Sequence, residues 1–296
     1  MKVRIFEVGP RDGLQNESQI LPVAVKLQFI SLLKKAGHYD IEAGAFVRPD
    51  LIPQMADSKE LIKKLPPSPG VNFWSLVPNE RGFEEALASN IKNIAIFTAA
   101  SETFNQKNIN TSIEGSFDRF RAFIPHAKKK GIKIRGYVST AFGCPYEGKI
   151  DPKMVLKVTE RLLKVGCHEV SVGDTIGVAN PSQVHKLAPK LLKLVGTKKL
   201  ALHFHDTRGT ALANILAALE DGVRSFDSSS AGIGGCPYAP GASGNVATDD
   251  VVYMLEEMGV TTGIDLKLQV KASEFIQKVL GRKLSSKYLQ AALAAN

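Results

Sequence analysis

The stretch Leu200-Ala-Leu-His-Phe-His-Asp206 is an apolar run that ends in two histidines. It predicts a buried strand, and because side chains alternate along a strand, His203 and His205 lie on the same face. Two imidazoles about 7 Å apart can bind one cation if other elements supply oxygen ligands. The alternative is a pair of unrelated polar residues at the end of a strand, so the rest of the chain must decide.

Strand and helix signals alternate along the rest of the chain. Helix signals include Pro22 and Gly37 at the two ends of one segment, and Asp57-Ser-Lys-Glu60, which resembles a capping box. Further strands are expected at residues 3–8, 39–43, 72–77, 93–98, 133–139, 169–172 and 223–228. Strands that alternate with helices in this way predict a closed (β/α)8 barrel, the TIM barrel. An open doubly wound sheet is the alternative, but no Gly-x-Gly-x-x-Gly follows the first strand.

The length of the chain fits one domain. Its 296 residues exceed the roughly 250 that such a barrel typically needs. We therefore expect a single domain, with the barrel over about residues 1–247 and extra helices over about residues 248–296.

Charge and composition narrow the class of protein. The net charge of +9 could indicate nucleic-acid binding, but lysines cluster at expected helix ends, as at Lys34-Lys35 and Lys128-Lys-Lys130. No run of 18 apolar residues occurs, so no membrane span is expected. A strand beginning at residue 3 leaves no room for a targeting peptide, so we expect a cytoplasmic protein that binds neither nucleic acid nor membrane. Three cysteines without a Cys-x-x-Cys pair predict neither a disulfide framework nor a zinc knuckle.

Polar residues collect where the expected strands end, which is where the active site of an α/β barrel forms. There Asp12, His203, His205 and Asn245 offer two nitrogen and two oxygen ligands. This set suits Mg²⁺ or Mn²⁺, and two histidines with one carboxylate could also bind iron(II). Zinc is less favoured without a thiolate or a third histidine. Asp12 could instead be a turn residue, and Asn245 a helix cap before Thr248.

Further candidates are expected at the same end of the barrel. Glu42 within a barrel strand would be costly unless paired, and Arg11 is its natural partner. Arg11 could stabilise a developing enolate or alkoxide, and a surface salt bridge is the alternative. The segment Gly232–Gly244 has five glycines and two prolines, which is typical of a lid, although it could be a floppy connection. Cys236 in its middle is a candidate catalytic thiol.

These residues belong to longer stretches that resemble a known family. The stretches are Glu7-Val-Gly-Pro-Arg-Asp-Gly-Leu-Gln-Asn-Glu17, Arg135-Gly-Tyr-Val-Ser139, Gly143-Cys-Pro-Tyr-Glu-Gly-Lys149, Gly173-Asp-Thr-Ile-Gly177 and the Cys236 loop. Nearly end to end, the chain resembles the 3-hydroxy-3-methylglutaryl-CoA lyases of the DRE-TIM metallolyase superfamily.

The resemblance implies an activity and a set of site residues. The implied reaction is the divalent-metal-dependent cleavage of 3-hydroxy-3-methylglutaryl-CoA, an acyl-CoA, to acetoacetate and acetyl-CoA, and the implied assembly is a homodimer. The superfamily's Arg, Asp and Glu signature falls on Arg11, Asp12 and Glu42. The resemblance implies metal binding by Asp12, His203, His205 and Asn245, catalysis by Arg11, Glu42, Asp174, His203 and Cys236, and substrate binding by Arg11, Gln15, Tyr137 and Ser171.

Other functions are open alternatives. One is a condensing enzyme of the isopropylmalate or homocitrate synthase type, against which the Cys236 loop and the short C-terminal part argue. Another is a catalytically inactive barrel that binds an acyl-CoA or a partner protein. The third is a lyase for a related branched 3-hydroxyacyl-CoA, because such lyases commonly carry Lys, Ser and Tyr where this chain has Ser18, Ala45 and Arg208.

Overall fold

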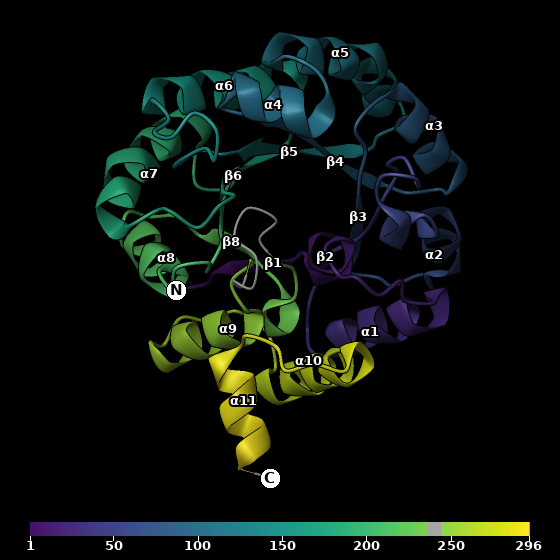
Figure 1. Cartoon of the computed structure of the whole chain (residues 1–296), viewed down its shortest axis with the longest axis vertical. Coiled ribbons are helices and arrows are strands. Elements are labelled where there is room, and N and C mark those ends of the chain that lie inside the picture. Colours follow the sequence, from purple (N-terminus) through teal and green to yellow (C-terminus); the bar gives the residue numbers. More distant parts are fainter. Residues whose placement is uncertain (236–243, 296) are drawn as a thin grey trace.

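The computed structural model describes residues 1–235 and 244–295. In that part of the chain, eight parallel strands follow one another around a closed barrel, and the last pairs with the first (Figure 1). The strands are β1 (Arg4–Glu7), β2 (Asp40–Ala45), β3 (Asn72–Leu76), β4 (Asn93–Ala99), β5 (Lys133–Ser139), β6 (Glu169–Asp174), β7 (Leu200–Phe204) and β8 (Ser225–Ser228). The predicted (β/α)8 barrel is confirmed.

Helices surround the barrel and cover the outer faces of its strands (Figure 1). The ring consists of α1 (Val23–Lys35), α2 (Ser58–Lys64), α3 (Glu80–Ala88), α4 (Glu102–Ile109), α5 (Ile113–Lys129), α6 (Pro152–Val165), α7 (Pro181–Val195) and α8 (Ala211–Glu220). Three more helices follow the barrel, namely α9 (Thr248–Glu257), α10 (Leu266–Leu280) and α11 (Lys287–Ala294). Short helical turns are η1 (Gly9–Gly13), η2 (Pro53–Met55) and η3 (Ser230–Gly232). The α10 helix lies against α1, and α11 projects from the barrel.

Local sequence explains where α7 begins. The side chain of Asn180 accepts the amide of Gln183 in a capping box, so α7 begins at Pro181.

The capping box predicted at Asp57 is wrong. Asp57 has φ −91° and ψ 5° rather than the extended backbone of an N-cap, and its carboxylate instead accepts a hydrogen bond from the buried Lys26 Nζ at 2.6 Å.

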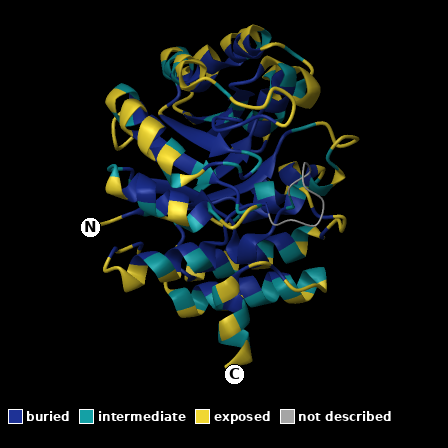
Figure 2. Ribbon diagram, turned by 60° about the vertical axis from the view of Figure 1, so that its left-hand side comes forward, coloured by how far each residue is buried: buried dark blue, intermediate teal, exposed yellow. Residues whose placement is uncertain are grey.

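The interior of the barrel carries charge where such barrels usually carry aliphatic layers. Ion pairs join strands that are not neighbours, so these contacts cross the interior: Arg4 of β1 pairs with Glu169 of β6, and Arg135 of β5 with Asp227 of β8. Arg135 Nε also lies 2.7 Å from Glu169 Oε1, which links the two pairs. Figure 2 shows the strands buried beneath the helices, and Arg135 is fully buried.

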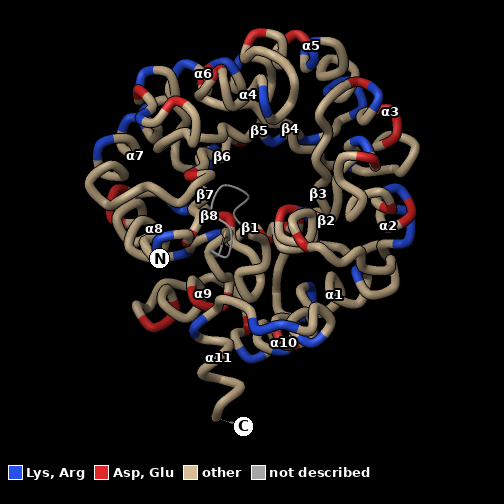
Figure 3. Tube along the Cα trace, in the orientation of Figure 1, with Lys and Arg blue, Asp and Glu red and all other residues tan. Residues whose placement is uncertain are grey.

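Most lysines and arginines lie on the surrounding helices (Figure 3). The last turn of α1 carries Lys34 and Lys35, and the last turn of α5 carries Lys128 and Lys129. Cations there interact favourably with the carbonyl end of the helix dipole. No helix in the described part of the chain has the length and apolarity that crossing a lipid bilayer requires.

Candidate active site

A cavity of about 860 Å³ opens at the carboxyl ends of the strands. Its walls come from elements far apart in the sequence, as expected for the functional end of such a barrel. Residues predicted for the site that line it are Arg11, Asp12, Gln15, Tyr137, Ser171, His203 and His205.

The η1 turn after β1 places Arg11 and Asp12 at this mouth. The amides of Arg11, Asp12 and Gly13 all converge on the carbonyl oxygen of Val8, at 3.1, 2.8 and 3.3 Å. The amide of Gly9 donates to Glu7 Oε1 at 2.8 Å, and a Cβ at this glycine would come within 2.6 Å of that oxygen. The Glu-x-Gly spacing therefore lets the chain turn tightly enough to bring Arg11 into the mouth.

Arg11 forms the predicted pair with Glu42 of β2. Its Nε and Nη2 both lie near Glu42 Oε2, at 2.6 and 2.5 Å, and its Nη1 donates to Asp12 Oδ1 at 2.6 Å. Burial alone would lower the pKa of Arg11, but Glu42 and Asp12 outweigh it and raise that pKa. Arg11 is only 7% exposed, so the alternative of a surface salt bridge is wrong.

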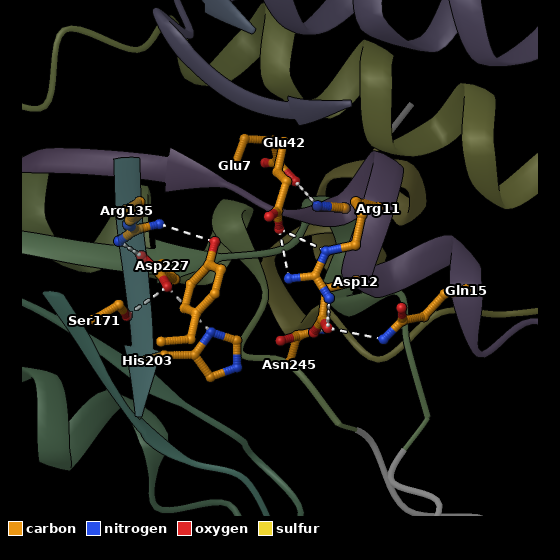
Figure 4. A network of polar contacts seen from close by, with 12 residues as sticks. Glu7, Arg11, Asp12, Gln15, Glu42, Arg135, Ser171, His203, Asp227 and Asn245 are labelled. Atoms are coloured by element: carbon orange, nitrogen blue, oxygen red, sulfur yellow. Dashed lines mark hydrogen bonds and ion pairs between the residues drawn. The ribbon is translucent and has the colours of Figure 1, made fainter. Parts of the chain in front are cut away.

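Three of the four predicted metal ligands form a cluster. One ligand atom from each of Asp12, His203 and His205 lies within 4.8 Å of the others, and the imidazole centroids are 5.1 Å apart. Asn245 Nδ2 donates to Asp12 Oδ2 at 2.9 Å, so the fourth residue adjoins them (Figure 4). The helix-cap alternative for Asn245 is wrong, because Ala247 precedes α9 at the cap position.

The cluster has the donors that a divalent cation needs. His205 Nδ1 and Asn245 Oδ1 are buried and have no hydrogen-bond partner among the described residues. Burial and the neighbouring His203 lower the pKa of His205 to about 3, which keeps this imidazole neutral and able to donate a lone pair. Burial would raise the pKa of Asp12, but Arg11 and the histidines lower it, so it stays a carboxylate. Two nitrogens and two oxygens in this setting fit a divalent cation.

The residues predicted to bind substrate surround this cluster. Gln15 Nε2 donates to Asp12 Oδ1 at 3.1 Å. The Arg11 guanidinium lies 5.7 Å from the centre of the Tyr137 ring, and burial raises the pKa of Tyr137 well above its usual value, so its phenol stays neutral. Ser171 Oγ donates to Asp227 Oδ2 at 2.8 Å.

Asp174, predicted as a catalytic residue, ends β6. Asp174 is fully buried, and its carboxylate accepts hydrogen bonds from the amides of Val178 and Ala179, both at 2.9 Å. It therefore fixes the loop after β6. Cys236 lies outside the described residues.

The three departures from the lyase pattern are not among the residues that line the cavity. Ser18 is exposed, and Ala45 is 1% exposed and packs in the core between barrel and helices. Arg208 Nη1 donates to the carbonyls of Ile176 and Gly177, at 2.7 and 3.0 Å. Arg208 is exposed, and these two hydrogen bonds tie it to the loop after β6.

The sequence analysis missed Asp227, which joins this site to the barrel interior. Its Oδ1 accepts from Arg135 Nη2 at 2.6 Å, and its Oδ2 lies 3.4 Å from His203 Nδ1 (Figure 4). Burial opposes ionisation, but Arg135 and His203 lower the pKa of Asp227 to about 2. The available signal was an acidic residue in the middle of an expected barrel strand, which burial makes costly unless a partner faces it.

Comparison with known proteins points to one family. The HMGL-like family profile matches residues 2–276. Human "Hydroxymethylglutaryl-CoA lyase, mitochondrial" is 51% identical over 290 residues, 98% of this chain and 89% of that protein. Zebrafish (Danio rerio) "3-hydroxy-3-methylglutaryl-CoA lyase, cytoplasmic" is 50% identical over 289 residues, 98% of this chain and 86% of that one. The Acinetobacter baumannii HMG-CoA lyase in complex with coenzyme A and 3-methylmalate superposes with a TM-score of 0.94 at 39% identity, covering 98% and 95% of the two chains.

Proposed function

This chain belongs to the HMGL-like family, and from that membership we propose that its barrel mouth cleaves 3-hydroxy-3-methylglutaryl-CoA to acetoacetate and acetyl-CoA. The chain is a carbon–carbon lyase. The observation that carries the proposal is the convergence of a buried Arg11–Glu42 pair and the cluster of Asp12, His203 and His205 on one cavity.

The reaction moves one proton off the substrate and one onto the product. The C3 hydroxyl loses its proton as the C2–C3 bond breaks, and C3 becomes the ketone carbon of acetoacetate. The bonding pair goes to C2, which becomes part of the thioester enolate of acetyl-CoA. Protonation of C2 then gives acetyl-CoA.

We assign the stabilisation of this enolate to Arg11. Its guanidinium lines the cavity, remains charged, and is held by Glu42 on one side and Asp12 on the other. Donors fixed before the reaction need not reorganise as charge develops, and loss of one such donor typically lowers kcat about 10²–10³-fold.

We assign the metal ligands to Asp12, His203, His205 and Asn245, with Mg²⁺ or Mn²⁺ as the proposed ion. When bound, a divalent cation lowers the cost of negative charge on substrate oxygens. The unpartnered His205 Nδ1 and Asn245 Oδ1 and the neutral state of His205 support this assignment.

The shape and charge of the cavity support an acyl-CoA substrate. Its outer part includes Arg48, Lys107 and Arg119, whose charges complement the phosphates of coenzyme A. We propose that Gln15, Tyr137 and Ser171 contact the acyl part, because they lie beside Arg11 and the metal cluster.

Proton transfer and assembly complete the proposal. We assign delivery of the C2 proton to Cys236 or to a water, with His203 as a second proton-transfer group and Asp174 as a supporting residue. We also propose that the chain forms one domain and a homodimer. A cytoplasmic location is proposed on the likeness to the zebrafish protein, while the human relative carries a mitochondrial name.

Product analysis with and without a metal chelator tests the function. Purified protein with Mg²⁺ should release acetyl-CoA and acetoacetate in equal amounts, and chelation should stop the release. Condensation of acetyl-CoA with a 2-oxo acid would favour the synthase alternative, and absence of both reactions would favour an inactive barrel. The substrate assignment would be wrong if kcat/KM for 3-hydroxy-3-methylglutaryl-CoA were about 100-fold below that for a longer-chain analogue, a difference of about 2.7 kcal/mol. The class of reaction would still stand.

A further inference from the structure

Asp227 and His203 face each other across two neighbouring strands. In the parallel pairing of β7 and β8, His203 is the register partner of Asp227. Register partners on adjacent strands lie at the same height, and both of these side chains point into the barrel (Figure 4). His203 Nδ1 thus lies 3.4 Å from Asp227 Oδ2.

Hydrogen bonds to both oxygens fix the orientation of the Asp227 carboxylate. Arg135 Nη2 donates to Oδ1 at 2.6 Å, and Ser171 Oγ donates to Oδ2 at 2.8 Å. Arg135 is itself fully buried, with its guanidinium 3.7 Å from the Phe6 ring centre and its Nε 2.7 Å from Glu169. The carboxylate is therefore held from the far side of the barrel.

This geometry dictates which nitrogen of His203 can bind a cation. A carboxylate only accepts hydrogen bonds, so Nδ1 must carry the proton and Nε2 keeps the lone pair. We propose that Asp227 is a positioning residue that fixes the tautomer and orientation of His203, so that Nε2 faces Asp12 and His205 across the metal cluster. The inference rests on the metal site of the proposed function. It concerns His203 alone, because His205 Nδ1 has no partner in the part of the chain described.

The substitution Asp227→Asn should reverse the tautomer rather than only remove a charge. Arg135 offers donors alone, so the amide oxygen must stay toward Arg135 and the amide NH₂ turns toward His203. An NH₂ group donates to Nδ1, which places the ring proton on Nε2 and removes the lone pair needed for the metal. Loss of such a supporting partner typically lowers metal affinity about 10–100-fold.

Mn²⁺ titration of the full chain, followed by the EPR signal of free Mn²⁺, measures this effect. Asp227→Asn should weaken binding about 10–100-fold. The matched control is Asp40→Asn, which removes a buried carboxylate that accepts from Arg4 and Trp74 and does not touch His203. We expect it to change the Mn²⁺ affinity less than about threefold, since it contacts no ligand. An affinity of Asp227→Asn within about threefold of wild type would overturn the inference.

A double-mutant cycle separates positioning from a general structural effect. If Asp227 acts through His203, then Asp227→Asn should weaken Mn²⁺ binding no further once His203→Ala is in place. Additive losses would instead show that Asp227 acts by another route and would refute the proposed role. His205→Ala provides the reference for the site: if it leaves Mn²⁺ affinity unchanged, the proposed metal site fails and this inference fails with it. Weakening by His205→Ala but not by Asp227→Asn overturns this inference alone.

The wild-type protein tests the same point without any variant. In the Mg²⁺-loaded protein, ¹⁵N NMR of the imidazoles should show the proton of His203 on Nδ1. A proton on Nε2 would contradict the inference even if Asp227→Asn failed to fold.

Discussion

Divalent cations should raise the thermal stability of this protein, and His205→Ala should abolish the gain. Native folding brings ligand atoms of Asp12, His203 and His205 within 4.8 Å of one another, whereas along the sequence Asp12 lies 191 and 193 residues from the two histidines. A cation bound by this cluster therefore favours the native state over the unfolded one.

The size of the gain follows from the affinity and the length of the chain. At a free Mn²⁺ concentration about 100 times Kd, binding stabilises the native state by about 2.7 kcal/mol. An unfolding entropy of about 2.1 cal/mol/K per residue gives about 0.6 kcal/mol/K for 296 residues. The melting temperature should therefore rise by about 4 °C.

Of the proposed metal ligands, His205 is the best one to substitute in this test. Its imidazole is 7% exposed, its Nδ1 lacks a partner among the described residues, and its pKa of about 3 keeps it neutral at working pH. The alanine variant loses the ligand without leaving an ionised partner unpaired, so the metal-free protein should still melt cooperatively. We expect the gain on adding Mn²⁺ to fall below about 1 °C, because with Kd weakened about 100-fold the same Mn²⁺ concentration stabilises the native state by only about 0.4 kcal/mol.

Differential scanning calorimetry on chelator-treated protein, with and without Mn²⁺, measures both quantities. His185→Ala is the matched control, because His185 is a half-exposed histidine that pairs with Asp221 on the outer helices. It should keep the full gain. The reasoning is refuted if wild type gains nothing at saturating Mn²⁺, or if His205→Ala gains as much as wild type.

Three other outcomes can be checked directly. Arg11→Gln should lower kcat about 10²–10³-fold, because it removes a charged donor from the cavity, and steady-state kinetics that show an unchanged kcat would exclude that role. Cys236→Ala should stop turnover while leaving Mn²⁺ affinity intact, and normal turnover would remove this thiol from the mechanism. Burial raises the pKa of Asp249 to about 7, above the value near 3.9 of an unfolded chain, so wild type should lose stability as pH rises from about 4 to 7. Asp249→Asn should remove that loss, so above pH 7 the variant should be more stable than wild type by a few kcal/mol at most, on the scale of about 1.4 kcal/mol per pK unit. Urea unfolding at several pH values measures the difference in stability, and a difference that does not change with pH would contradict the prediction.

The sequence predicts the architecture and the cluster because both depend on local patterns. Apolar runs that alternate with capped helices specify a barrel, and the alternation of side chains in β7 places His203 and His205 on one face. Local patterns fail where a tertiary contact competes. The sequence from Asp57 to Glu60 resembles a capping box, but the Asp57 carboxylate accepts a hydrogen bond from Lys26 instead of capping α2. The short α4 helix was not predicted separately, although Ser101 caps it by accepting the amide of Phe104.

Contacts across the barrel could not be predicted from local pattern. Asp227 meets Arg135 from 92 residues away, between strands that are not neighbours in the sheet. Glu7 at the end of β1 accepts from Ser230, which follows the neighbouring β8, and from Thr248, which begins α9; these contacts depend on the closure of the barrel. Both partners become visible only once the strand register and the closure of the barrel are known.

The charged interior explains why the mouth can hold its ligands rigidly. A buried ion pair gives little net stability, but removing one partner leaves an uncompensated buried charge, which typically costs about 3–5 kcal/mol. Each member of the series from Arg4 through Glu169 and Arg135 to Asp227 is thus held in place by the next. A displaced strand would separate members of this series and leave charges buried without their partners. The same ion pairs that cross the barrel therefore fix the carboxylate that faces His203, and with it one wall of the cavity.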